Sequence, residues 1–331
     1  MNIFPSKKTV NIMIQDYVIR MAASAKGTNS LTLREEPLPA GMIEEGHIVD
    51  EQQFFELMKE LVESWELKKS RVQFFVPDSS VLMKPVMIPS HLKPDAVNAY
   101  FMMETGQSLH FPFEDPLIDV IRLDHLTKSR TGQVETPGIL FASPQEYVIA
   151  YANAFEDVKM KPVTAEVRSL AIHRFLNSLQ LLKKEKTYLI SEWSINMVNI
   201  SIFSENVIDF MRYQPIETTL SDWKPERDGE EIHFSFYGDQ NLYDQQLEDR
   251  IAEIERLMNF YQFSLHKGEK EINEIILTGD NPYIKEIGQK LTDYYNLPVT
   301  VVNEAFLESD HHGVKGKYTA LMGLFQKGAE R

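Results

Sequence analysis

The order of predicted strands and helices constrains this chain most, because the same order occurs twice. Each half begins with short β-rich segments and continues with strands separated by amphipathic helices. In the first half we expect a hairpin over 10–19, a strand over 31–33, a helix over 50–65 and a strand over 71–76. In the second half we expect strands over 187–190, 196–203 and 207–213, a helix over 242–265, and strands over 272–277 and 298–302 around a helix over 282–295. This pattern predicts a mixed-sheet α/β protein of duplicated plan.

Two other segments have a character of their own. Residues 79–167 predict the order strand, helix, strand, strand, helix, strand, with the first helix over 93–109, which is a self-contained α+β module. Residues 217–231 hold six acidic and two basic side chains. A charged segment of this kind predicts a solvated loop.

The composition excludes several classes of function. The chain has 331 residues and a formal net charge of −15, so we expect it to bind neither nucleic acid nor an anionic membrane surface directly. It contains no cysteine, which excludes disulfides, a thiol nucleophile and a cysteine zinc site. The first eight residues lack the apolar stretch of a signal peptide. The longest apolar run, 147–152, is far shorter than the ~20 residues of a spanning helix, so we expect a cytoplasmic protein.

Four segments carry a resemblance to a known family. They are PLPAGMIEEGHIVDEQQF (37–54), LMKPVMIPSHLKPDAVNAYFMMETGQSLHFPFED (82–115), EIERLMNFYQ (253–262) and EIILTGDNP (274–282). Taken in order, they resemble the PilM family of type IV pilus assembly proteins, which is related to the cell-division protein FtsA. The resemblance covers nearly the whole chain.

The resemblance implies the actin/Hsp70-like (ribonuclease H-like) fold, in which two lobes flank a nucleotide site. The first lobe would comprise 1–78, 168–185 and 314–331, and the second lobe 186–313. The 79–167 module would be the inserted α+β subdomain of FtsA-like proteins. The resemblance also implies a cytoplasmic scaffold of a type IV or competence-type pilus machine. Such a protein binds the cytoplasmic tail of a PilN-like inner-membrane partner, lies at the inner face of the membrane through it, and faces the pilus motor components.

The phosphate-binding motifs that the resemblance implies are degenerate. In this fold, two hairpin turns each carry an Asp that holds Mg²⁺ and, two residues later, a Gly that lets the backbone approach a phosphate. Met13 and Gln15 stand at these positions in the first turn, and Ser191 and Trp193 in the second. A thioether does not bind Mg²⁺, which prefers oxygen ligands. We expect the indole of Trp193 to occupy the space that a phosphate would need.

The remaining nucleotide positions support the same expectation. The loop that would receive the adenosine keeps Gly279 but adds the carboxylate of Asp280. Asp16 and Glu192 lie one residue from the Asp positions, so a slipped register would restore carboxylates but not the glycines. We therefore expect no bound nucleotide or metal and no ATP hydrolysis. The alternatives are an active actin-like ATPase that uses Mg-ATP between the lobes, and a sugar-kinase-like enzyme, for which the chain lacks an Asp in a suitable motif.

Other catalytic signals are weak. The chain has no Walker A, dinucleotide-binding, zincin or nucleophile-elbow motif. The run 310–312 (DHH) predicts a polar loop, since adjacent histidines point in different directions. Glu253 and Arg256 have the spacing of a helix-face ion pair, although they also match the place where the fold's helix passes a ribose.

The 79–167 module is rich in Met and Phe, and Met side chains adapt well to peptides. We expect a peptide groove at the boundary of the module with the first lobe. Met103, Phe111, Pro112 and Phe113 are the candidate lining residues. The alternative is that these side chains form the core of the module.

Overall fold

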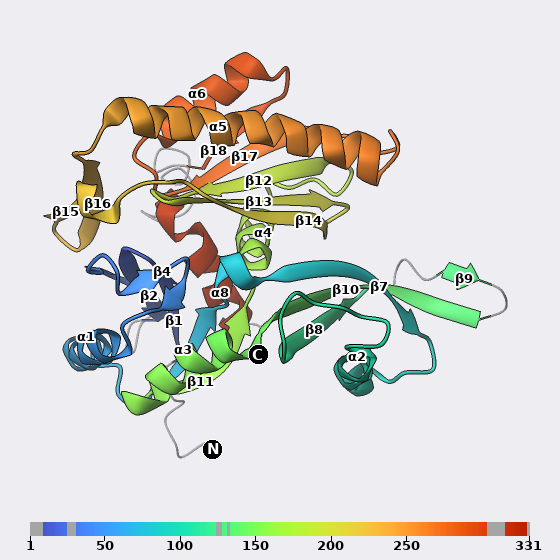
Figure 1. Cartoon of the computed structure of the whole chain (residues 1–331), viewed down its shortest axis with the longest axis horizontal. Helices are drawn as coiled ribbons and strands as arrows, with labels where there is room; N and C mark the ends of the chain where they lie inside the picture. Colours follow the sequence, from blue (N-terminus) through green and yellow to red (C-terminus); the bar gives the residue numbers. More distant parts are fainter. Residues whose placement is uncertain (1–8, 25–30, 124–127, 131–132, 303–314, 330–331) are drawn as a thin grey trace. The chain divides into compact units, whose positions relative to one another are not determined.

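Two five-stranded sheets of the same plan form the framework of the larger of two compact units in this computed structural model (Figure 1). The structure describes residues 9–24, 31–123, 128–130, 133–302 and 315–329. The larger unit comprises Met1–Ser79 and Phe155–Arg331, and the smaller unit comprises Ser80–Ala154.

The first sheet has the strand order β11-β6-β1-β2-β3. Its strands are β1 (Thr9–Gln15), β2 (Val18–Ser24), β3 (Leu31–Pro37), β6 (Arg71–Phe75) and β11 (Lys161–Glu166). The first three form an antiparallel meander, whereas β6 runs parallel to β1 and β11 runs parallel to β6. The short strands β4 (Ile43–Glu44) and β5 (His47–Ile48) pair separately.

The second sheet repeats this plan in the order β14-β13-β12-β17-β18. Its strands are β12 (Thr187–Trp193), β13 (Met197–Ser204), β14 (Val207–Pro215), β17 (Glu274–Gly279) and β18 (Val299–Val301). Again a meander of three strands is followed by two parallel strands. The duplication predicted from the sequence is confirmed. We call the parts built on the two sheets the first lobe and the second lobe.

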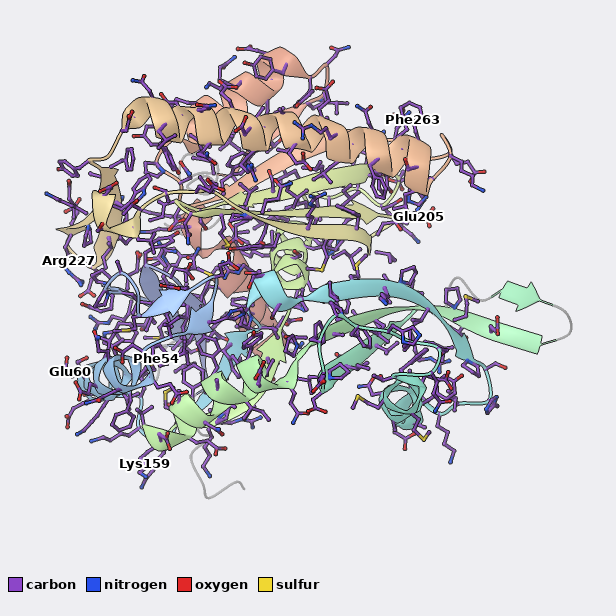
Figure 2. All side chains as sticks on the ribbon, viewed as in Figure 1. Phe54, Glu60, Lys159, Glu205, Arg227 and Phe263 are labelled. Atoms are coloured by element: carbon purple, nitrogen blue, oxygen red, sulfur yellow. The ribbon has the colours of Figure 1, made fainter. Side chains whose placement is uncertain are left out.

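Helices complete both lobes. They are α1 (Glu51–Ser64), α4 (Arg168–Ser178) and α8 (Thr319–Ala329) with the first sheet, and α5 (Gln240–Asn259), its π-helical continuation η5 (Phe260–Leu265) and α6 (Ile284–Tyr294) with the second. Asp50 starts α1 by accepting a hydrogen bond from the backbone N–H of Gln53 (2.9 Å), as an N-cap residue should. Phe54 of α1 is buried, whereas Phe263 at the end of η5 is 61% exposed (Figure 2).

The smaller unit is a sheet with a helix on one face. Its strands are β7 (Leu82–Pro89), β8 (Pro116–Arg122), β9 (Lys128–Arg130) and β10 (Gln133–Pro144), with β10 between β7 and β8. Helix α2 (Val97–Glu104) covers one face through a cluster that includes Ile88, Phe101, Ile118 and Leu140. The chain leaves this unit within α3 (Gln145–Asp157).

Three expectations about these elements were wrong. The module expected over 79–167 extends too far, because β11 pairs with β6 in the first sheet instead of joining the sheet of the smaller unit. The helix expected to reach residue 109 ends at Glu104, two residues before Gly106, which has a left-handed φ of 81°. The loop expected over 217–231 contains most of the hairpin formed by β15 (Trp223–Asp228) and β16 (Glu231–Phe236).

Within the described ranges, no helix combines the length and apolar character needed to cross a membrane.

Candidate functional site

The two hairpin turns that would wrap a phosphate are tied directly to each other. The β1–β2 turn follows Gln15, and the β12–β13 connection follows Trp193. The side-chain amide of Gln15 donates a hydrogen bond to Ser194 Oγ (2.7 Å). The side-chain amide of Asn196 donates one to Asp16 Oδ2 (2.7 Å). The side chains of the two lobes therefore fill the space between the turns.

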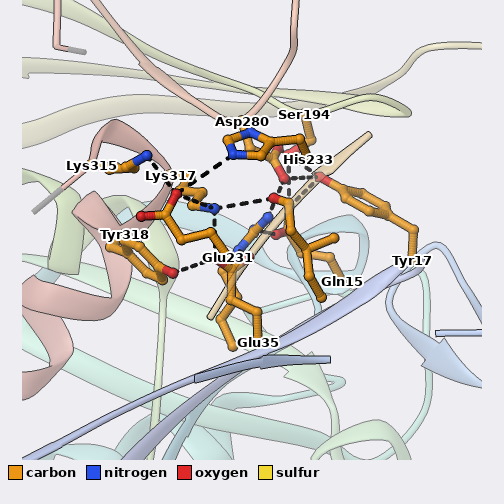
Figure 3. A network of polar contacts seen from close by, with 12 residues as sticks. Gln15, Tyr17, Glu35, Ser194, Glu231, His233, Asp280, Lys315, Lys317 and Tyr318 are labelled. Carbon is orange, nitrogen blue, oxygen red and sulfur yellow. Dashed lines mark hydrogen bonds and ion pairs between the residues drawn. The ribbon is translucent and has the colours of Figure 1, made fainter. Parts of the chain in front are cut away.

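A buried arginine joins this contact from the first lobe. Arg20 is 1% exposed, and its Nε donates to Glu35 Oε2 (2.9 Å). Its Nη1 donates to Gln15 Oε1 (2.6 Å) and its Nη2 to Asp280 Oδ2 (2.6 Å) in the second lobe. The hydroxyl of Tyr17 also donates to Asp280 (2.7 Å). One guanidinium group thus connects both lobes and pairs with two carboxylates, those of Glu35 and Asp280. Both acidic residues are labelled in Figure 3.

Glu35 has further cationic and polar partners. Lys317 Nζ lies 2.5 Å from its Oε1, and the Tyr318 hydroxyl donates to the same oxygen. Burial alone would raise the pKa of Glu35, yet Arg20 and Lys317 hold it below its ordinary value. Burial, reinforced by the nearby Arg20, lowers the pKa of Lys317.

A second buried arginine lies at the start of α4. Arg168 is 4% exposed, and its Nε lies 2.8 Å from Asp78 Oδ2. Its Nη1 lies 3.5 Å from Oε2 of Glu192 on β12, which also accepts a hydrogen bond from the Asn199 amide (3.4 Å). Burial raises the pKa of both Asp78 and Glu192 although Arg168 opposes this. The guanidinium of Arg168 therefore places a positive charge beside the second turn.

Trp193 and Gly279 serve packing. The indole of Trp193 is fully buried in the core cluster of the second lobe and donates to Ser191 Oγ (3.0 Å). The indole packs in that core, and it is Gln15 and Ser194 that meet between the two turns. Gly279 has a φ of 123°, and a Cβ atom there would lie 2.0 Å from the carbonyl oxygen of Trp193. Only glycine fits this close approach of β17 to β12.

A cavity of about 410 Å³ opens beside the first turn. Its lining residues come from both lobes: Asp16, Ala40, Gly41, Ile43, Glu44, Glu45, Asn196, Tyr213, Pro215, Ile216, Glu217, Thr218, Thr219, Leu220 and Ser221. The lining holds four carboxylate residues and neither lysine nor arginine. Asp16 accepts backbone hydrogen bonds from Glu45 (2.9 Å) and Gly46 (2.8 Å), and burial raises its pKa.

The structure brings most of the predicted nucleotide positions together, with changed roles. Gln15, Asp16 and Asp280 meet at the turns, and Glu192 joins Arg168 beside them. Met13 is a core residue of the first lobe, and Ser191 is fully buried. The pair Glu253–Arg256 forms the expected ion pair (2.8 Å). The run 310–312 lies outside the described residues.

The predicted partner-binding residues divide into two groups. Phe111 and Phe113 stack on each other with ring centroids 5.6 Å apart and pack against the core cluster of the smaller unit. Met103 and Pro112 are exposed, Met103 by 67%. A packing role therefore accounts for the two aromatic residues, and a partner-binding role for the four residues stays a prediction.

The sequence analysis missed both arginines. Arg20 stands in an otherwise apolar strand and lies directly opposite Glu35 in the β2–β3 register. A single charged residue in an apolar strand, opposite an acidic residue in the next strand, could have indicated a buried ion pair. Arg168 offered none, because its partners come from positions 78 and 192.

Comparison with known proteins identifies the family. The family of type IV pilus assembly protein PilM matches residues 12–217, which is more than half of the chain. This chain belongs to the PilM family. No curated protein matches it in sequence.

Solved structures confirm the actin-like fold. The PilM–PilN type IV pilus biogenesis complex is 15% identical, with a TM-score of 0.76, and the match covers 99% of this chain and 100% of that chain. MreB5 of Spiroplasma citri bound to ADP is 10% identical, with a TM-score of 0.51, and the match covers 98% of each chain. A Bacteroides thetaiotaomicron protein with an actin-like ATPase fold is 10% identical, with a TM-score of 0.51, and 96% of this chain and 95% of that chain are covered.

The chemistry of this site is ionic pairing within the chain. The carboxylates around the turns have arginine and lysine partners from the same protein. Among the described residues, no three His, Asp or Glu side chains form a group that could hold a metal ion.

Proposed function

We propose that this PilM-family protein is a scaffold of a pilus assembly machine that binds the cytoplasmic tail of a PilN-like membrane protein through its smaller unit, without hydrolysing ATP. The solved PilM–PilN complex, which shares the fold, supports the identity of the partner. Such a partner would hold the protein at the inner face of the cell membrane, next to the pilus motor components.

The observation that carries the proposal is a set of exposed apolar side chains on the outer strands β7 and β8 of the smaller unit, on the sheet face away from α2. Helix α2 covers the face that holds Ile88, Ile118 and Leu140. On the opposite face of β8, the side chains of Leu117 and Ile121 are 44% and 37% exposed. Met87 of β7, at 37% exposed, is paired with Pro137 on the same face.

An antiparallel sheet with one solvated face ordinarily carries polar side chains there. Exposed apolar groups on this face therefore favour a partner, and an extended peptide with apolar side chains fits a surface of this kind. Met102 and Met103 of α2 add a second exposed apolar pair to the same unit, at 44% and 67%.

The contacts at the turns support a role without ATP. Two hydrogen bonds, Gln15–Ser194 and Asp16–Asn196, join the turns directly to each other, so the turns are held together without a phosphate. The nearby cavity has four carboxylates and no cationic side chain, so a triphosphate would meet like charge. The residues present do not fit Mg-ATP.

Tail binding can be tested with a labelled peptide of the tail and fluorescence anisotropy on the full chain. We expect Leu117→Asp with Ile121→Asp to weaken binding at least about tenfold, because two apolar contacts of ~1 kcal/mol or more are lost. Leu242→Asp is the matched control, since Leu242 is 57% exposed and lies in the larger unit. Unchanged binding in the double variant, or equal loss in the control, would contradict the proposal. Met103→Asp tests the α2 surface separately.

Nucleotide binding can be tested by thermal unfolding in millimolar Mg-ATP. A ligand at 100 times its dissociation constant adds ~2.7 kcal/mol of stability, which shifts the Tm of a domain of this size by several degrees. We expect a shift near zero. A clear Mg-dependent shift would support an active ATPase instead.

A further inference from the structure

The β15–β16 hairpin belongs to the second lobe by its place in the chain but contacts the first. It follows β14 and precedes α5, and its turn is Asp228–Gly229–Glu230, with Gly229 at a left-handed φ of 60°. In Figure 1 it lies at the left, below one end of α5, and β16 contacts β3. It is the hairpin in the segment that the composition predicted to be a solvated loop.

The apolar side of the hairpin is buried between the lobes. Ile232 and Phe234 of β16 are 2% and 8% exposed and belong to the second-lobe core cluster. The same cluster includes Tyr17 from the first turn. The rings of Phe234 and Tyr17 meet edge to face, with centroids 4.9 Å apart and an interplanar angle of 88°. This contact fixes the hairpin on the tip of the first turn.

Ion pairs connect the end of the hairpin to β3. Arg34 Nη1 lies 2.7 Å from Glu230 Oε2, and Arg227 Nη2 lies 2.9 Å from Glu36 Oε2. Each partner contributes one cation and one anion, so the two pairs form only in this orientation. All four side chains are about one third or more exposed.

Lysines that precede α8 hold the hairpin from another direction. Lys317 donates a hydrogen bond to the carbonyl oxygen of Ile232 (3.1 Å) while it pairs with Glu35. Lys315 lies 2.5 Å from Glu231 Oε2 (Figure 3). The hairpin therefore contacts three separate segments of the first lobe: the first turn, β3 and the start of α8.

We propose that the β15–β16 hairpin is a clasp that holds the two lobes closed without a bound ligand. Two-lobed proteins commonly close around a ligand, whose contacts with both sides supply the closing free energy. Here the clasp supplies such contacts from within the chain. Its exposed ion pairs make the fraction of open molecules depend on ionic strength, because salt screens exposed charges.

The absence of cysteine makes a direct test possible. Ser194 is fully buried between the turns, so Ser194→Cys introduces a single thiol that a reagent reaches only when the lobes open. Ser201→Cys places a thiol inside the second sheet, at 2% exposed, and reports global unfolding. The labelling rate of each thiol is measured in the full chain with and without changes to the clasp.

We expect Arg34→Glu with Arg227→Glu to speed labelling at position 194 by about three- to tenfold, since two exposed ion pairs contribute modestly. Adding Glu36→Arg and Glu230→Arg swaps both pairs and should restore the slow rate. The control Lys224→Glu reverses a charge on the hairpin that faces Tyr237, and should change nothing. Raising the salt should speed labelling at position 194 in the unaltered clasp but not in the double variant.

Two results would overturn the proposal. The first is a double variant that labels at position 194 at the original rate. The second is an equal increase at position 201, because the hairpin would then stabilise the whole fold instead of the closed arrangement.

Discussion

Between the two hairpin turns, polar side chains are buried and paired, whereas on the outer strands β7 and β8 of the smaller unit apolar side chains are exposed. Arg20 and Asp280 meet at 2.6 Å with side chains that are 1% and 6% exposed. Leu117 and Ile121 are exposed by 44% and 37%. The polar groups of the first region are paired within the chain, and we propose that the exposed apolar groups of the second region bind a partner. The proposed function follows from this contrast.

The largest expected effect tests whether the turn contacts are structural. Arg20→Ala removes the cation shared by Glu35 and Asp280 and leaves two buried carboxylates without it. Breaking a buried ion pair costs about 3–5 kcal/mol, so we expect the free energy of unfolding to fall by that amount in chemical denaturation. Arg20→Lys is the matched control and should lose less. A loss below about 1 kcal/mol for the alanine variant would show that this region is not a structural connection.

Sequence patterns anticipated the apolar framework and missed the polar contacts, for a physical reason. The two meanders could be predicted from alternating β-rich segments, because such a pattern depends only on residues that are neighbours in the sequence. The clasp was missed because the acidic residues of 217–231 conceal the alternation that ends in Ile232 and Phe234. Its ion-pair partners, Arg34 and Glu36, lie about two hundred residues away in the chain.

The candidate site also has one feature that the sequence could predict and one that it could not. The loss of the phosphate motifs could be predicted from Met13 and Gln15, since each motif is a short run of the sequence. The buried ion pairs beside the turns could not be predicted, because Arg168 meets Asp78 and Glu192 only after folding.

The next expected effect tests the covered face of the smaller sheet. Ile88 is fully buried under α2, so Ile88→Ala should destabilise the smaller unit by about 2–5 kcal/mol through lost burial and a cavity. Hydrogen exchange of residues 80–123 in the full chain reports this unit separately. Exchange unchanged from the original protein would mean that this face is not the core.

A pH measurement tests a half-buried histidine on α4. His173 stacks on Phe203 of β13 at 4.1 Å, and burial lowers its pKa from 6.5 to about 4. Because the folded pKa is depressed, this group contributes stability above pH 6.5 that is lost as the pH falls towards 4. We expect His173→Phe, which keeps the stacked ring, to remove about 1–3 kcal/mol of that acid-induced loss in denaturation curves between pH 7 and 4. Parallel curves for the two proteins would contradict this.

The smallest expected effect completes the contrast. Leu117→Asp changes an exposed side chain, so it should alter the free energy of unfolding by no more than about 0.5 kcal/mol. The measurement is the denaturation midpoint, and Ile88→Ala serves as the buried counterpart on the same sheet. A loss as large as that of Ile88→Ala would show that the side chain of Leu117 is covered in the free protein.

Gly279 shows how a search for nucleotide-binding motifs can be misled. The glycine stands where a nucleotide loop would have one, yet a Cβ atom there would collide with the backbone of Trp193. This close contact requires a glycine here whether or not a nucleotide binds. The presence of a glycine in this loop is therefore no evidence for ATP binding. A search that counts motif residues will overestimate nucleotide binding wherever strand packing alone requires one of them.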